Sequence, residues 1–144
     1  MTKLLVLQGA NMNWLGIREP DKYGSTTAAE LDEMIRRHAS EHGYEVEIFY
    51  TNLEGEAIDR LYKAHEEGVH AVVMNPGGFT YAGYALGDCM RGIKVPVVEV
   101  HMTNHYARGL HSVSAAAARC VFMGLGAQVY IHGLDAALHL ARGA

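Results

Sequence analysis

Apolar and polar residues along this 144-residue chain alternate between short strand patterns and longer helical patterns. Leu4 to Leu7 is a continuous apolar run, typical of a strand that is buried on both faces of a parallel sheet. After a long loop, apolar residues recur at helical spacing from Leu31 to Gly43, and Thr27-Ala28-Ala29-Glu30 in front of them fits a capping box. The chain is therefore predicted to begin as strand, loop and helix.

The same alternation continues towards the C-terminus. Further strands are predicted at residues 45–51, 71–74, 95–100 and 120–125, and further helices at 58–68, 81–91 and 127–141, with a turn at 75–78. Ile58, Leu61, Tyr62 and His65 form the expected apolar stripe of one helix, and the alanine-rich stretch after residue 114 is ambiguous. Five strand patterns without a linker predict one domain over residues 1–144, an α/β fold with a doubly wound five-stranded parallel sheet and helices on both faces.

Composition narrows the class of protein. Hydrophobic residues make up 49% of the chain and charged residues 19%, which suits a globular core. A formal charge of −4 without a basic run argues against a nucleic-acid partner. No apolar run approaches the roughly twenty residues that span a bilayer, and no signal peptide is recognised, so no membrane association is expected. Cys89 and Cys120 lack a metal-type spacing, which favours a reduced, cytoplasmic protein.

The loop from Asn11 to Gly24 places an asparagine, an arginine and a tyrosine together after the first strand. A free phenol titrates near ~10, so it acts as a base at neutral pH only where a cation or a hydrogen-bond donor stabilises the phenolate. A guanidinium supplies a permanent positive charge. Tyr23 is therefore a candidate base and Arg18 its candidate activator. A packing or turn role for Tyr23 is the alternative from this loop alone.

Polar segments follow the first, third and fourth predicted strands, at residues 8–11, 75–78 and 99–104. Ligands of open parallel sheets bind beyond the carboxyl ends of the strands, so these segments are expected to converge on one cleft. Glu99 and His101 are two residues apart and share a strand face, where a carboxylate orients an imidazole and favours its charged form. His101 is thus a candidate general acid. With nine histidines in the chain, a purely structural role is the alternative.

A metal site was weighed for His101, His105 and His111, which are close in sequence. Their spacing matches no regular ligand pattern. The sequence is therefore interpreted as that of a protein without a metal or another cofactor.

Four sequence motifs, which follow one another along the chain, are similar to those of a known enzyme family. They are G-A-N-M-N-W-L-G-I-R-E-P with the following Tyr23-Gly24, then N-P-G-G-F-T-Y, V-E-V-H-M-T-N, and a late G-L-G. From about Lys3 to Leu140 the chain resembles the type II dehydroquinase family. The resemblance implies a flavodoxin-like fold and a lyase activity, the dehydration of 3-dehydroquinate to 3-dehydroshikimate. It also implies a small carboxylated cyclic substrate and a homo-oligomer, usually a dodecamer built from trimers.

The resemblance also implies roles for single residues. Tyr23 would be the base that removes a proton beside the ketone, and Arg18 would keep it ionised. Asn11 would orient a water against the enolate oxygen. His101 would protonate the departing hydroxyl, oriented by Glu99.

Substrate binding is implied in the same way. Asn75 and the backbone amides of Met102 and Thr103 match the family's carboxylate clamp. Asp88 matches an acidic residue that reaches a neighbouring subunit's site.

The chain departs from the family pattern at the end of the site that binds the ring hydroxyls. Tyr81 stands where the family has a histidine, and the shortened segment 107–112 retains Arg108 but lacks a second arginine. Gln8 and Ala10 replace an asparagine and a proline, at positions expected on the rim of the site. Tyr81 and Arg108 are therefore the candidate substrate-binding residues at this end.

These departures leave three interpretations. The chain is a dehydratase that acts on dehydroquinate, weakly if the lost donors are not replaced, since each charge-assisted hydrogen bond is worth ~1.5–3 kcal/mol. It could instead act on a related cyclic β-hydroxy ketone with a less polar distal end. The third interpretation is a catalytically silent binding or scaffold protein, since fold alone does not imply function.

Overall fold

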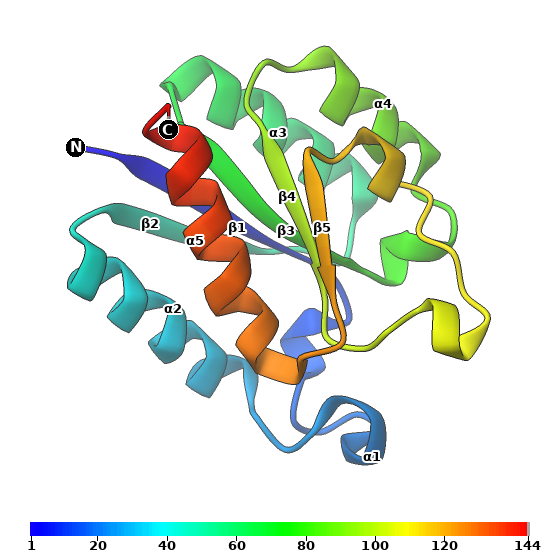
Figure 1. Ribbon diagram of the computed structural model, residues 1–144. Helices are drawn as coiled ribbons and strands as arrows, with labels where there is room; N and C mark the ends of the chain where they lie inside the picture. The colour runs from blue at the N-terminus through cyan, green and yellow to red at the C-terminus, as the bar shows by residue number, and fades with distance from the viewer. Residues whose placement is uncertain (144) are drawn as a thin grey trace.

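The sheet is parallel throughout, and its strand order is the one known from flavodoxin. A computed structural model describes residues 1–143. The strands are β1 (Lys3–Ala10), β2 (Glu45–Tyr50), β3 (Ala71–Gly77), β4 (Val97–His101) and β5 (Cys120–Met123). They lie in the order β2-β1-β3-β4-β5 (Figure 1). This order is flavodoxin-like, with a switch point between β1 and β3.

Helices cover both faces of the sheet. They are α1 (Pro20–Tyr23), α2 (Ala28–His42), α3 (Glu54–Glu67), α4 (Tyr84–Gly92) and α5 (Val129–Ala141). The pair α2 and α5 packs on one face and the pair α3 and α4 on the other (Figure 1). The predicted α/β class with helices on both faces is confirmed. Within residues 1–143, no helix has both the length and the apolar character that a membrane crossing requires.

The central strand β1 explains the apolar run at the start of the chain. Leu4 and Val6 point into the apolar cluster under α2 and α5, whereas Leu5 and Leu7 point into the cluster under α3 and α4. All four side chains are buried. Because successive side chains of a strand face opposite sides, burial on both faces removes the polar alternation of a surface strand.

The predicted start and end of α2 and the predicted end of α3 are confirmed, whereas α3 begins at Glu54 and not at residue 58. The Oγ1 atom of Thr27 accepts a hydrogen bond from the backbone of Glu30 at 3.1 Å, and the Glu30 carboxylate accepts from the Thr27 amide at 3.0 Å. This reciprocal pair satisfies two amides that a helix start leaves free. At the other ends, Gly43 and Gly68 adopt positive φ angles of 68° and 76°, which glycine tolerates.

Three other local predictions were wrong. The segment 75–78 does not form a separate turn after the strand, because β3 continues to Gly77 and a 3-10 turn, Gly78–Tyr81, follows. The next helix therefore begins at Tyr84, and Tyr81 lies outside it. On α3, Tyr62 is exposed, while Arg60 is buried and pairs with Glu47 of the edge strand. A long charged side chain can bury its methylene groups while its charged end pairs with an acidic neighbour. Hydrophobic periodicity does not predict such burial.

The ends of β1 and β3 meet more closely than side chains would allow. A Cβ atom on Gly9 would lie 2.1 Å from the Pro76 carbonyl oxygen, and one on Gly77 would lie 2.3 Å from the Ala10 oxygen. Both positions therefore require glycine. This close approach fixes the two strand ends from which the adjoining loops start.

We expect Gly9→Ala to lower the free energy of unfolding by about 2–3 kcal/mol, because the added methyl group forces two backbones apart. Gly55→Ala is the matched control, since a Cβ atom there meets nothing within 4 Å. The control should leave stability unchanged or raise it by up to about 1 kcal/mol. Urea unfolding of both variants measures the difference. Equal stabilities would show that the close approach of β1 and β3 tolerates a side chain.

Candidate active site

A cavity opens at the carboxyl ends of β1, β3 and β4. Nine of the eleven residues singled out from the sequence line it: Asn11, Arg18, Tyr23, Asn75, Tyr81, His101, Met102, Thr103 and Arg108. Glu99 lies beneath it, fully buried. Asp88 does not line it: its side chain is exposed on α4 and pairs with Arg91 at 3.2 Å. The strand-end segments thus converge as the sequence indicated.

Tyr23 ends the short helix α1 and has two guanidinium groups near its ring. The Arg18 Cζ atom is 4.8 Å from the centre of the Tyr23 ring, and the Arg108 Cζ atom is 5.7 Å from it. Arg108 also donates a hydrogen bond to the Thr103 hydroxyl at 2.9 Å. Positive charge near a phenol stabilises its phenolate. The structure therefore places Arg108 beside the candidate base as well as beside Thr103, a contact that the sequence did not suggest.

Asn11 is held in an uncommon backbone conformation. Its φ and ψ angles are 75° and −1°, in the left-handed region, and its amide donates to the Asn52 side chain at 2.8 Å. Such a conformation costs free energy for a residue with a Cβ atom, although asparagine tolerates it better than most. Strain of this kind is characteristic of functional loops. It sets the position of the Asn11 side chain at the wall of the cavity.

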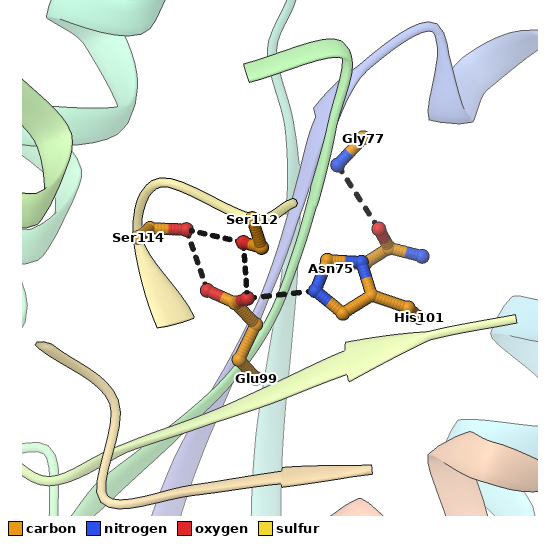
Figure 2. A network of polar contacts seen from close by, with 6 residues as sticks. All are labelled: Asn75, Gly77, Glu99, His101, Ser112 and Ser114. Carbon is orange, nitrogen blue, oxygen red and sulfur yellow. Dashed lines mark hydrogen bonds and ion pairs between the residues drawn. The ribbon is translucent and has the colours of Figure 1, made fainter. Parts of the chain in front are cut away.

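His101 is oriented by a buried carboxylate (Figure 2). Its Nε2–H donates to the Glu99 carboxylate at 2.7 Å, and Ser112 and Ser114 donate to the same carboxylate at 2.7 and 2.5 Å. Burial alone would raise the pKa of Glu99, but the hydrogen bonds from His101, Ser114 and Ser112 together outweigh burial and hold this pKa below its ordinary value. Glu99 is therefore an anion that fixes the ring of His101.

Asn75 is oriented by a second buried network. Its Nδ2 donates to the Tyr130 hydroxyl at 2.9 Å, and its Oδ1 accepts from the Gly77 amide at 3.0 Å (Figure 2 shows the latter). The Tyr130 hydroxyl in turn donates to Gln8 at 2.6 Å. The amide of Asn75 keeps one further N–H for a ligand.

Gln8 was expected on the rim of the site, and this was wrong. It is fully buried, since the inward face of β1 directs it to Tyr130 on α5. Tyr130 itself was missed, because its partner Asn75 is 55 residues away in the sequence.

Two buried polar atoms at the cavity have no hydrogen-bond partner among residues 1–143. They are the Thr80 hydroxyl oxygen and the His105 Nδ1 atom. The His105 ring also lies 4.0 Å from that of His101, measured between ring centres. Unpaired buried polar atoms are rare and costly in native proteins, and a bound ligand is one explanation for them. The sequence pointed to His105 only as a metal ligand and did not point to Thr80 at all.

Metal-ligating side chains gather elsewhere. Within residues 1–143, one group of His, Cys, Asp or Glu side chains brings three ligand atoms within 4.8 Å of one another: His38, His42 and Asp135. These residues lie on α2 and α5 and do not line the cavity. His101, His105 and His111 do not form such a group.

The fold and the site together define a flavodoxin-like α/β protein with a polar cavity at the carboxyl ends of its parallel strands. The family model described as Dehydroquinase class II matches residues 2–138. A 3-dehydroquinate dehydratase of Syntrophotalea carbinolica is 46% identical over 145 residues, covering 99% of this chain and 98% of that protein. The one of Thioalkalivibrio sulfidiphilus is 42% identical and 99% of each chain is covered. The chain therefore belongs to the type II dehydroquinase family.

Solved structures agree with this assignment. The type II dehydroquinase of Butyrivibrio crossotus superposes with a TM-score of 0.90 at 32% identity, covering 95% of this chain and 97% of that one. A 3-dehydroquinate dehydratase-like protein of Bifidobacterium longum gives a TM-score of 0.74 at 30% identity, with 99% of both chains covered. The flavodoxin-like fold, the family and the dehydratase class of the activity are thus confirmed.

The environment of His105 predicts a pH-dependent stability. Burial, together with His101 and Arg108, lowers the pKa of His105 from 6.5 to about 4. Between these two values the unfolded chain binds a proton that the folded chain does not, so stability is complete above pH 6.5 and falls as the pH drops towards 4.

Relative to His105→Asn, the natural protein should lose about 1–2 kcal/mol more unfolding free energy between pH 6.5 and pH 5. His111→Asn removes an exposed histidine of the same loop and should keep the natural pH dependence. Urea unfolding across this range measures all three slopes. If the unfolding free energy of the natural protein changes with pH no more steeply than that of His105→Asn, this result would contradict a buried neutral imidazole.

Proposed function

We propose that the cavity catalyses the dehydration of 3-dehydroquinate, or of a close carboxylated cyclic β-hydroxy ketone, with Tyr23 as base and His101 as acid. One observation carries the proposal: a tyrosine with two guanidinium groups near its ring lines the same cavity as a histidine paired with a buried carboxylate. The names of the relatives support the choice of 3-dehydroquinate as the first substrate to test.

The first step needs a base and a group that accepts developing negative charge. Tyr23, with the guanidinium groups of Arg18 and Arg108 near its ring, acts as the base and removes a proton from the carbon next to the ketone, and the electrons move onto the ketone oxygen as an enolate. Asn11 holds a water against this oxygen, so that the enolate is stabilised by hydrogen bonds. Its fixed backbone conformation favours such a role.

The second step needs an acid. As the enolate collapses, the β-hydroxyl leaves and takes a proton from His101, so the products are the enone and water. Glu99 occupies the Nε2 side of the ring, which leaves Nδ1 for the leaving hydroxyl. The Glu99 carboxylate orients the ring during the transfer. No step requires a cofactor.

The substrate carboxylate fits the clamp of Asn75 and the amides of Met102 and Thr103. Asn75 contributes its spare N–H, and its orientation is set by Tyr130 and Gly77. The nearby guanidinium of Arg108 adds positive charge. Charge-assisted hydrogen bonds of this kind are about twice as strong as neutral ones.

The distal end of the substrate is where this chain differs from the family pattern. We assign its hydroxyl groups to the Thr80 hydroxyl and to His105, because these buried polar atoms lack partners among residues 1–143. Tyr81 is exposed at the mouth of the cavity and offers a further donor. These groups can replace the donors that the sequence lacks at this end. They therefore support ordinary dehydroquinate chemistry over a less polar substrate.

A catalytically silent scaffold is not favoured. Such a protein has no need of an ionised Glu99 beneath His101 or of two cations around Tyr23. In addition, relatives named as 3-dehydroquinate dehydratases are more than 40% identical to this chain over nearly its whole length.

We further propose a homo-oligomer, with trimers that assemble into dodecamers, in a reducing, cytoplasmic environment. Exposed Tyr62 and Tyr84 on α3 and α4 support an interface there. The position of Asp88 on α4, away from its own cavity, supports a role towards a neighbouring subunit. Cys89 and Cys120 are both free, as expected in a reducing compartment.

Tyr23→Phe should lower kcat/KM for 3-dehydroquinate by about 10²–10⁴-fold, since the base is lost while the ring remains. Tyr106→Phe is the matched control, because Tyr106 is exposed on the loop that carries Arg108 and does not line the cavity. The rise of enone absorbance measures turnover, and calorimetry with the product should show near-normal binding to both variants. Equal activity of the two variants would reject Tyr23 as the base.

A further inference from the structure

Helices α2 and α5 bring two imidazoles and a carboxylate together outside the cavity described above. His38 and His42 are four residues apart on α2, so they share one side of the helix, and Asp135 faces them from α5. One potential ligand atom from each of the three lies within 4.8 Å of the others. The group borders an open groove, lined also by Arg37 and Glu41. None of these residues lines the catalytic cavity.

The hydrogen bonds of the two rings prepare them as ligands. The His42 Nδ1 atom is 2.8 Å from the His38 carbonyl oxygen, which can only accept, so the proton of neutral His42 is on Nδ1 and its Nε2 has a free lone pair. The His38 Nδ1 atom is 2.7 Å from the Tyr44 hydroxyl. In metal sites the non-ligating ring nitrogen is almost always held by an oxygen in this way. Both rings therefore present Nε2 to the groove.

We propose that His38, His42 and Asp135 form a binding site for a divalent transition-metal ion of the zinc class. Two imidazole nitrogens and one carboxylate, with water in the open position, are a ligand set that suits Zn²⁺. A histidine pair with three residues between its members is also a regular ligand spacing. The bound ion would join α2 to α5, which cover the same face of the sheet.

Metal binding requires His38 to change its tautomer, without a net gain or loss of a proton. Without metal, the His38 Nε2–H donates to Asp135 at 2.8 Å and the Tyr44 hydroxyl donates to Nδ1. With metal, Nε2 loses its proton and Nδ1 gains one, so His38 stays neutral and Tyr44 turns to accept.

The ring of His42 must also turn. It stacks on that of His38, with ring centres 3.9 Å apart and planes 17° apart, so in this position it does not point at His38 Nε2 and Asp135 from the far side of a shared ion. His42 is exposed and is held by one hydrogen bond, from its Nδ1 to the His38 carbonyl oxygen, whereas His38 is buried and held by Tyr44. A rotation of the exposed ring alone brings its lone pair towards an ion on His38 and Asp135.

Calorimetry of the chelator-treated full-length protein with ZnCl₂ tests the site, and Co²⁺ absorbance reports the ligand geometry. We expect one ion per chain and a melting temperature that rises with Zn²⁺ concentration. His42→Gln should weaken binding at least tenfold, and Tyr44→Phe, which removes the hydroxyl behind His38, about 10–100-fold. His139→Gln, an exposed histidine of α5, is the matched control and should bind as the natural protein does.

Absence of saturable binding would overturn the proposal, as would equal affinities of His42→Gln and His139→Gln. An unchanged affinity of Tyr44→Phe would overturn the preparation of His38 by its hydroxyl. These readouts do not involve turnover, so they are independent of the proposed dehydratase chemistry.

Discussion

A single buried anion, Glu99, organises the catalytic end of this molecule. A carboxylate with no exposed surface is expensive unless hydrogen bonds replace its water, and here His101, Ser112 and Ser114 do so. Because two of these donors come from a loop more than ten residues further on, the charge also fixes that loop against β4. The orientation of His101 and the position of the segment 112–114 therefore depend on one anion.

The sequence predicted what short-range pattern can encode. The unbroken apolar run Leu4–Leu7 indicated a strand covered on both faces, and Thr27 with Glu30 marked a helix start to the residue. Glu99 and His101 could be paired because two residues apart on a strand means one shared face. In each case the information lies within a few residues of chain.

Contacts between distant elements were not predictable in this way. Ser112 and Ser114 bind Glu99, and Tyr130 binds Asn75, across sequence separations that periodicity does not describe. The same holds for Arg108, which approaches Tyr23 from a loop 85 residues away. Gln8 illustrates the opposite error, since a residue next to the site in sequence proved to be buried behind it. Such details depend on how helices and loops pack on the sheet.

The proposed reaction depends on how the substrate is oriented in the cavity. A crystal structure of the protein with a carboxylate-bearing cyclic ketone tests this most directly. We expect the carboxylate at Asn75 and the amides of Met102 and Thr103, the carbon next to the ketone facing the Tyr23 oxygen, and the distal oxygens at Thr80 and His105. A ligand bound outside this cavity, or bound with that carbon turned away from Tyr23, would contradict the account.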